Sequence, residues 1–247
     1  MSENKQLDRN ASWAKPVSRL STADLPRGAV NLNVAGRQVV GPLQGFGQLW
    51  QKTYRVRLSG SEVTPTQVIQ VWKENFPRFW PPGNKFFGPL TGIKPGEVAV
   101  LNLAGPGGLS APGGMPVIST GVLVIYADDE SFSFMTPQGH MFAAIITFSA
   151  FDDDGTVVQV QALVRANDPL YELSFRLGVG HKAEDEFWQQ TLENLAAHFG
   201  VRGQVQQKVT LVDARVQWSQ ARNIWHNAAI RTAFYTPVAL VRRLIKR

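Results

Sequence analysis

The chain has 247 residues, of which 44% are hydrophobic and 18% are charged, as expected for one globular domain with an appendage. It contains no cysteine, which excludes a disulfide scaffold, an iron–sulfur cluster, a thiolate zinc site and a cysteine nucleophile. The N-terminus lacks the apolar core of a secretory signal, and no segment has the roughly 18 consecutive apolar residues of a membrane-spanning helix. The sequence therefore predicts a cytoplasmic protein.

The net charge of +6 is concentrated near the C-terminus. Residues 201–247 hold nine Lys or Arg and one acidic residue, whereas residues 95–164 hold seven acidic residues and no Lys or Arg. Because binding of nucleic acid across a sheet needs cations on that sheet, a sheet-face reader of RNA or DNA is disfavoured. The basic C-terminal segment is the part of the chain that can meet an anionic partner.

The first elements are an arm and a strand. Residues 1–30 are polar, contain Pro16 and Pro26 and show no sustained period. They predict an N-terminal arm that is either mobile or laid over the body as a strap, with Trp13 as its anchor. Residues 49–58 then alternate apolar and polar side chains, which predicts a strand with one buried face.

A helix and an aromatic loop come next. Thr64-Pro65 is a helix start, because threonine caps a helix and proline suits its first turn. The apolar stripe that follows predicts a helix ending near Phe76, before Pro77. The segment RFWPPGNKFFGPLTGIKPG mixes turn residues with aromatic rings, which predicts an ordered loop whose rings cover the core.

The pattern then changes to strands. Their sequences are EVAVLNLA, TGVLVIYA, SFSFMT, AAIITFSAF and TVVQVQALVRA, between residues 97 and 166. Short turns separate the later strands, notably Pro137-Gln138-Gly139 and the acidic turn at residues 152–155, so antiparallel neighbours are predicted. The GPGGLSAPGGMP segment lacks the ending of a phosphate loop and is predicted to be a flexible loop or lid.

A helix is predicted from Ala183 to Phe199, ending at Gly200. Its apolar residues are spaced four, three and four apart, so they form one face that packs on the sheet. The acidic residues at 184–186 suit the positive end of the helix dipole. The fold class predicted is therefore α+β, a curved antiparallel sheet wrapped on a long C-terminal helix.

Several short motifs follow one another in the second half of the chain: TPQGH at 136–140, DGTV at 154–157, ALVR at 162–165 and DPL at 168–170. Together with the element order, this succession resembles an uncharacterised bacterial family grouped with the START-type (SRPBCC-like) helix-grip superfamily. The resemblance covers roughly residues 36–200 and implies the helix-grip fold with a cavity, but no established reaction. Val164 stands where that family often has serine, so no role for that hydroxyl is carried over.

The predicted domain organisation is an N-terminal arm at residues 1–30, a helix-grip domain at 31–200 and a basic amphipathic helical tail at 201–247. The function expected is binding, sequestration or presentation of a hydrophobic small molecule, such as a lipid, isoprenoid or polyketide-like compound, in an internal cavity. The residues expected to contact it are Tyr126, Phe132, Phe134, His140, Phe148, Arg165, Trp188, Leu192 and Leu195. The aromatic residues among them are equally typical of an ordinary core.

An aromatase/cyclase- or isomerase-type enzyme in the same cavity is the main alternative. His140 titrates near neutrality and Arg165 can grip a carboxylate, so these two are the predicted catalytic residues if a reaction occurs. His140 also fits a turn cap, and Arg165 fits the solvated face of its strand. No metal site and no cofactor are predicted, because the four histidines are scattered and no nucleotide or metal motif is present.

The tail carries a separate prediction. Trp218 and Trp225 fall on an apolar stripe at helical spacing, and the final segment adds cations at Arg242, Arg243, Lys246 and Arg247. Such a segment is typical of peripheral docking on an anionic membrane. The alternatives are a helix packed on the body or on a second copy, which would make the protein an oligomerising interaction module, and nucleic-acid binding.

Overall fold

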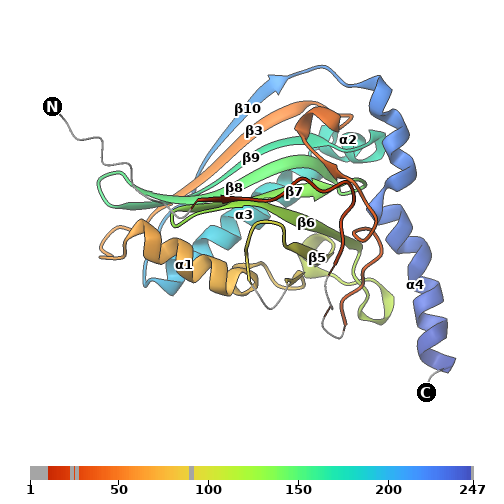
Figure 1. Ribbon diagram of the computed structural model, residues 1–247, viewed down its shortest axis with the longest axis horizontal. Coiled ribbons are helices and arrows are strands. Elements are labelled where there is room, and N and C mark those ends of the chain that lie inside the picture. The colour runs from red at the N-terminus through yellow and green to blue at the C-terminus, as the bar shows by residue number, and fades with distance from the viewer. Residues whose placement is uncertain (1–10, 23–24, 26–27, 89–91, 246–247) are drawn as a thin grey trace.

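The computed structural model describes residues 11–22, 25, 28–88 and 92–245. A single curved antiparallel sheet is covered on its concave face by two helices, α1 (Pro65–Asn75) and α3 (Val179–His198), as Figure 1 shows. The short helix α2 (Pro169–Arg176) precedes α3, and α4 (Ala228–Ile245) runs along the end of the sheet. The predicted α+β class, a curved antiparallel sheet wrapped on a long helix, is confirmed.

The sheet has the order β10-β3-β9-β8-β7-β6-β5-β4, and β1 and β2 pair with β6 and β7 outside this path. The strands are β1 (Ser12–Trp13), β2 (Val39–Val40), β3 (Leu49–Arg57), β4 (Lys85–Phe87), β5 (Val98–Leu103), β6 (Ile118–Ala127), β7 (Ser131–Pro137), β8 (Phe142–Asp152), β9 (Thr156–Ala166) and β10 (Gln206–Asp213). Every pairing is antiparallel, because short turns join most consecutive strands.

The capping and turn residues at the ends of these elements adopt the conformations that the sequence predicts. The Thr64 hydroxyl accepts a hydrogen bond from the backbone N–H of Gln67 and so caps α1. The β8–β9 hairpin closes through Asp154 and Gly155, whose φ angles of +52° and +103° suit aspartate and glycine in a tight turn.

The space between the sheet and α3 is filled by rings. Phe132 and Phe148 stack with their centroids 4.7 Å apart, Phe76 of the α1 end lies 5.1 Å from Phe148, and Trp188 of α3 lies 5.4 Å from Phe148. Leu192 of α3 is fully buried against the same cluster. Aromatic side chains thus occupy the region in which the sequence predicts a cavity.

The C-terminal segment differs from its prediction. Residues 206–213 form β10, which pairs with β3, and the helical tail proposed for residues 201–247 is wrong over this stretch. A 3-10 segment, η5 (Trp218–His226), and α4 follow. Leu211, Ala214 and Trp218 follow helical spacing, but β10 is an edge strand whose side chains are mostly exposed, so its sequence lacks the alternation that identifies a strand. Within the described residues, no helix has the length and apolar character needed to cross a membrane.

Candidate functional site

Six of the residues predicted to contact a ligand lie together in the core between the sheet and α3. They are Phe132, Phe134, Phe148, Trp188, Leu192 and Leu195. The other three, Tyr126, His140 and Arg165, lie elsewhere.

Tyr126 lies under the N-terminal strand. Its ring centroid is 4.6 Å from that of Trp13, and its hydroxyl donates to Asp128 Oδ2 at 2.7 Å. Tyr126 therefore contacts the strap that β1 forms over β6 and does not join the cluster beneath α3.

His140 is buried in the turn between β7 and β8. Its Nδ1 accepts a hydrogen bond from the backbone N–H of Phe142 at 3.0 Å, and its carbonyl accepts one from Asn167 at 2.9 Å. Burial lowers the pKa of His140 to about 4, so the ring is neutral at pH 7. These contacts are those of a turn cap, and the ring lies outside the cluster beneath α3.

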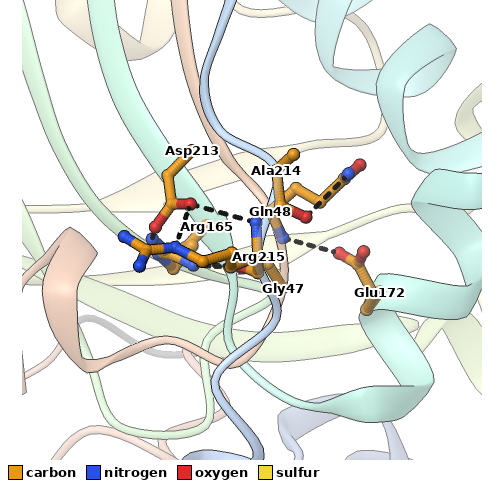
Figure 2. A network of polar contacts seen from close by, with 7 residues as sticks. All are labelled: Gly47, Gln48, Arg165, Glu172, Asp213, Ala214 and Arg215. Atoms are coloured by element: carbon orange, nitrogen blue, oxygen red, sulfur yellow. Dashed lines mark hydrogen bonds and ion pairs between the residues drawn. The ribbon is translucent and has the colours of Figure 1, made fainter.

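Arg165 lies on the outer face of β9, because its neighbours Val164 and Ala166 are the residues that face the core. Its guanidinium NH1 donates to the carbonyls of Gly47 at 2.6 Å and Arg215 at 2.8 Å, and NH2 pairs with Asp213 at 2.8 Å (Figure 2). The prediction that Arg165 binds a ligand or polarises a carbonyl inside the cavity is therefore wrong, since the side chain points away from the core.

The outer network of Figure 2 joins segments that are distant in the sequence. Gln48 donates its backbone N–H to Glu172 of α2 at 3.2 Å and its side-chain amide to the carbonyl of Ala214 at 3.1 Å. Asp213 also accepts from Arg215 Nε at 3.0 Å. Together with Arg165, these contacts fasten the end of β10 to β9 and α2, which is a structural role.

The concave face carries a charged cluster that the sequence prediction missed. The Nζ of Lys52, on β3, lies 2.8 Å from Glu184 Oε2 and 2.7 Å from Asp185 Oδ1, both on α3. The Tyr54 hydroxyl donates to the same oxygen of Asp185 at 2.6 Å. The Lys52 and Glu184 side chains are only 1% and 2% exposed. We call these four residues the Lys52 cluster.

The strand pattern explains why lysine reaches the interior. Lys52 has the same parity along β3 as Tyr54 and Val56, which belong to the core, so its side chain leaves the strand on the concave side. On α3, Glu184 is four residues before Trp188 and lies on the same buried face. Because α3 begins at Val179, Glu184 is not in the first turn, and the sequence-based assignment of residues 184–186 to the positive end of the dipole was wrong.

Burial and the neighbouring groups shift the pKa values of the two carboxylates in opposite directions. Burial raises the pKa of Glu184 to about 6, although Lys52 acts against this. Burial also disfavours the charge on Asp185, but hydrogen bonds from Lys52 and Tyr54 outweigh it and lower the pKa of Asp185. Burial, followed by the two nearby carboxylates, raises the pKa of Tyr54 and keeps the phenol protonated.

The Glu184 carboxylate is incompletely paired. Oε2 is paired with Lys52 Nζ at 2.8 Å, whereas Oε1 has no hydrogen-bond partner among the described residues. A buried carboxylate in this condition is costly, and natural proteins usually supply a donor. Nearby, His181 Nδ1 also lacks a partner among the described residues, and its ring packs edge-on against Trp50 at 5.0 Å.

The chemistry available in this cluster is hydrogen bonding and proton transfer. With Lys52, Glu184 and Asp185 ionised and the Tyr54 phenol neutral, one cation faces two anions, so the cluster favours a ligand that brings a hydroxyl or another donor over one that brings a carboxylate. Among the described residues, no three His, Asp or Glu side chains gather in the way a metal site needs.

No protein-family model matches the sequence, and no curated protein matches it. The structure is similar to protein Ms6760 from Mycobacterium smegmatis, at 14% identity, covering 61% of this chain and 90% of that one, with a TM-score of 0.42. It is similar to the di-domain ARO/CYC StfQ of the steffimycin biosynthetic pathway, at 9% identity and a TM-score of 0.46, covering 62% of this chain and 53% of that one, so the match spans about half of StfQ. It is also similar to ginseng major latex-like protein 151 from Panax ginseng, at 12% identity and a TM-score of 0.37, covering 62% of this chain and 99% of that one.

Proposed function

We propose that the protein binds a hydrophobic small molecule bearing a hydroxyl group, between the concave face of the sheet and α3. The observation that carries this proposal is the buried Glu184 carboxylate, whose Oε1 lacks a hydrogen-bond donor among the described residues and which adjoins the aromatic core. A ligand hydroxyl donating to Glu184 would satisfy the carboxylate. Lipid, isoprenoid and polyketide-like compounds all have members with this character.

The apolar part of the ligand would lie against the rings that follow Glu184 along α3. Trp188 is one turn further on the same helix face, and it contacts both Phe148 of β8 and Phe187. Because these rings now fill the space, binding requires them to move aside. Edge-on ring pairs are individually weak, at about 1 kcal/mol each, so the apolar surface that a ligand buries can offset their loss.

The ligand would enter where α3 meets β3 and β10. The contacts there are polar: Lys52 with Asp185, and the Gln189 amide donating to Gln207 of β10 at 3.1 Å. Asp185 is partly exposed, so the Lys52 cluster reaches the surface at this edge. A small outward movement of α3 would open this side while leaving the α1 side of the core closed.

Extraction of the purified protein tests the proposal. Organic extracts of the wild type, analysed by mass spectrometry, should contain a hydroxyl-bearing hydrophobic compound, and extracts of Glu184→Leu should contain much less of it. Glu186→Gln, a change at an exposed neighbouring position on α3, is the matched control and should retain the compound. Extracts of the wild type that match those of an unrelated protein from the same host would overturn the proposal.

Catalysis is the alternative use of the same site. Neither His140 nor Arg165 reaches the core cluster, so acid–base chemistry would fall to Glu184, whose pKa of about 6 allows it to give or take a proton near neutrality. A reaction of the bound compound that is lost in Glu184→Gln while binding persists would support an enzyme over a carrier.

Docking of the C-terminal region on an anionic membrane is the second part of the proposal, and the orientation of α4 favours it. The helix faces the body with small and polar residues, including Ala228, Thr232 and Thr236, which are buried. Phe234, at 78% exposed, and Val238 point outward. A helix that packs by small and polar residues and exposes larger apolar ones is suited to an interface, and the cations predicted at Arg242 and Arg243 suit anionic lipid.

The two tryptophans that the sequence assigned to membrane binding differ in setting. Trp225 is 81% exposed, whereas Trp218, although also exposed, packs its ring edge-on against Phe46 of the body at 5.3 Å. Trp225 is therefore the better candidate for insertion.

Vesicle flotation tests docking. The wild type should float with vesicles that contain phosphatidylserine and not with neutral vesicles, and Phe234→Ser combined with Val238→Ser should abolish flotation. Leu43→Ser, at an exposed apolar position on the body, is the control. If the wild type stays in solution and instead forms a dimer that the double variant dissolves, α4 is an oligomer interface and the membrane proposal fails.

Membership of the uncharacterised helix-grip family also belongs to this proposal. It rests on the motifs at residues 136–140 and 168–170, which come together in space around the start of α4 through the hydrogen bond from the Ala228 N–H to the Gly139 carbonyl and the one from Asn227 to Asp168.

A further inference from the structure

A groove runs along the outer face of β3 and β10, on the opposite side of the sheet from the aromatic core. Its first part has a volume of about 460 Å³ and lies where the chain passes from α3 into β10. Its second part, of about 350 Å³, continues along the two strands and shares Arg55 and Gln206 with the first. Both volumes are large enough for a small molecule.

The groove is basic. Its lining includes Arg55, Arg57, Arg202 and Lys208, and Asp153 is its one acidic residue among the described ones. This concentration contrasts with residues 95–164, which contain no Lys or Arg. An anion in the groove would meet cations from both strands and from the α3–β10 connection.

Asp153 marks where an anion fits. Its carboxylate lies 3.0 Å from the Arg57 guanidinium, and the Arg57 and Asp153 side chains are 41% and 66% exposed. Exposed pairs of this kind contribute little to stability, so a ligand anion can replace the carboxylate at small cost. The Asp153 carboxylate therefore occupies an anion position in the groove, and a ligand anion that binds more tightly can displace it.

The other two arginines are positioned differently. Arg55 donates its Nε to Gln159 at 2.6 Å, which orients the guanidinium and leaves its terminal nitrogens for a ligand. Arg202 is exposed and is carried by a connection that runs close to β3 at Gly203, where a Cβ would lie 2.6 Å from a Val56 methyl. Glycine at this position brings the connection against the strand.

The second part of the groove offers neutral hydrogen-bonding groups. Gln51, Thr53, Gln161 and Thr210 line it, and their amides and hydroxyls suit the hydroxyl groups of a polyol. We propose that this groove binds a phosphorylated, hydroxyl-rich small molecule, with its phosphate among Arg55, Arg57 and Arg202 and its hydroxyls along the glutamine and threonine side chains. This site is independent of the ligand proposed beneath α3.

Calorimetric titration with ribose 5-phosphate at low ionic strength tests the proposal, with ribose and inorganic phosphate as separate probes. Ribose 5-phosphate should bind, and more tightly than either fragment. Arg202→Gln should weaken binding by at least about threefold, because a charge-assisted contact is lost at an exposed site. Asp153→Asn should tighten binding by a similar factor, because it removes the competing carboxylate.

The gain in affinity expected for Asp153→Asn cannot arise from misfolding, so it is the decisive measurement. Lys182→Gln removes an exposed cation on α3, outside the groove, and controls for net charge. The proposal fails if Asp153→Asn leaves the affinity unchanged, or if Lys182→Gln weakens binding as much as Arg202→Gln does. It also fails if inorganic phosphate binds as tightly as ribose 5-phosphate, which would indicate nonspecific anion binding.

Discussion

The Lys52 cluster places three charged groups between the sheet and α3, where a protein core is ordinarily apolar. Removing charges from water costs several kcal/mol per ion, and their mutual attraction returns this only with good geometry and additional hydrogen bonds. Asp185 has two such bonds, from Lys52 and Tyr54, whereas Glu184 contacts only Lys52 and its Oε1 has no partner among the described residues. The Lys52 cluster therefore lowers the stability of the folded protein, which is consistent with a role in binding a ligand.

Substitution of Lys52 with methionine should destabilise the protein by about 3 to 5 kcal/mol, because it leaves the buried Glu184 carboxylate beside the partly exposed Asp185 carboxylate without a cation. Urea denaturation at pH 7 measures the change. Lys182→Met, at an exposed position on α3, should change the free energy of unfolding by less than about 0.5 kcal/mol. Equal effects of the two substitutions would contradict the ion-pair geometry described for Lys52.

The depressed pKa of His140 makes stability depend on pH. The unfolded chain accepts a proton near pH 6.5, whereas the folded chain resists it until about pH 4. The contribution of His140 to stability is thus present above pH 6.5 and is lost as the pH falls toward 4. His140→Asn keeps an acceptor for the Phe142 N–H but cannot be protonated, so its unfolding free energy should fall less over this window, by up to about 3 kcal/mol.

Urea denaturation at a series of pH values from 7 to 4 checks this prediction. Glu184 contributes in the opposite direction in both proteins: its raised pKa means that its stabilising contribution is present below about pH 4.5 and lost as the pH rises through about 6. The comparison with wild type removes this shared term. Parallel pH profiles for wild type and His140→Asn would refute the assignment.

At the scale of elements, the junction between η5 and α4 organises a buried polar network. Asn223 donates to the Asn167 carbonyl at 2.9 Å, and Asn227 donates to Asp168 Oδ2 at 2.8 Å. Asp168 in turn caps α2 through the N–H groups of Leu170 and Tyr171. The motif residues that follow β9 thus fasten the C-terminal segment to the body.

Replacement of Asn227 with alanine should destabilise the protein by about 2 to 3 kcal/mol. The substitution removes the bond to Asp168 and the acceptor for the Ile230 N–H at the start of α4, both of which are buried or partly buried. Thermal and urea unfolding measure the loss, with the surface change Gln70→Ala on α1 as a near-neutral control. A near-neutral Asn227→Ala would show that α4 is held by other contacts.

Some of the helices and strands can be predicted from the sequence, and others cannot. Strands β3 and β5 to β9 and helices α1 and α3 follow from periodic or continuous apolar runs bounded by turn and capping residues. β10 has no such signal, since it lies at the sheet edge with most of its side chains exposed. Lys52 was missed because a lysine in an alternating strand suggests a solvated face, although its parity with Tyr54 and Val56 pointed to the core.

The roles of Arg165 and His140 could not be derived from local patterns. Each is tied to a segment that is far away in the sequence, Arg165 to Asp213 and Arg215, and the His140 turn to residues 226–228 through Gly139. Gly139 has a φ of +92°, and a Cβ there would lie 2.0 Å from the His226 carbonyl oxygen, so only glycine allows this approach. Long-range contacts of this kind have no local signature.

For the molecule as a whole, the C-terminal segment is part of the fold. β10 extends the sheet beyond β3, the polar contacts of Asp213 and Arg215 cover Arg165, and α4 runs along the end of β6 and its neighbours (Figure 1). A binding test that deletes residues 205–247 would therefore disrupt the body along with any docking surface, which is why point substitutions on α4 are needed.

Two truncations test whether the C-terminal segment is part of the fold. Removal of residues 214–247 should lower the melting temperature strongly or prevent folding, because the Gly139 carbonyl, Asp168 Oδ2 and part of the Arg165 guanidinium lose the partners described for them. Removal of residues 240–247 keeps all of those contacts and should have a small effect. Circular dichroism melts of both forms provide the measurement, and similar melting temperatures for the two would contradict an integral C-terminal segment.

The pairing of β10 with β3 also affects how the chain folds while it is being synthesised. Ribosomes deliver residues 49–57 early and residues 206–213 late, so β3 waits with one row of backbone N–H and C=O groups unpaired while the rest of the sheet assembles. During that interval a nascent chain can pair edge to edge with another, and a holding chaperone would protect it. The interval ends when residues 206–213 have left the ribosome and pair with β3.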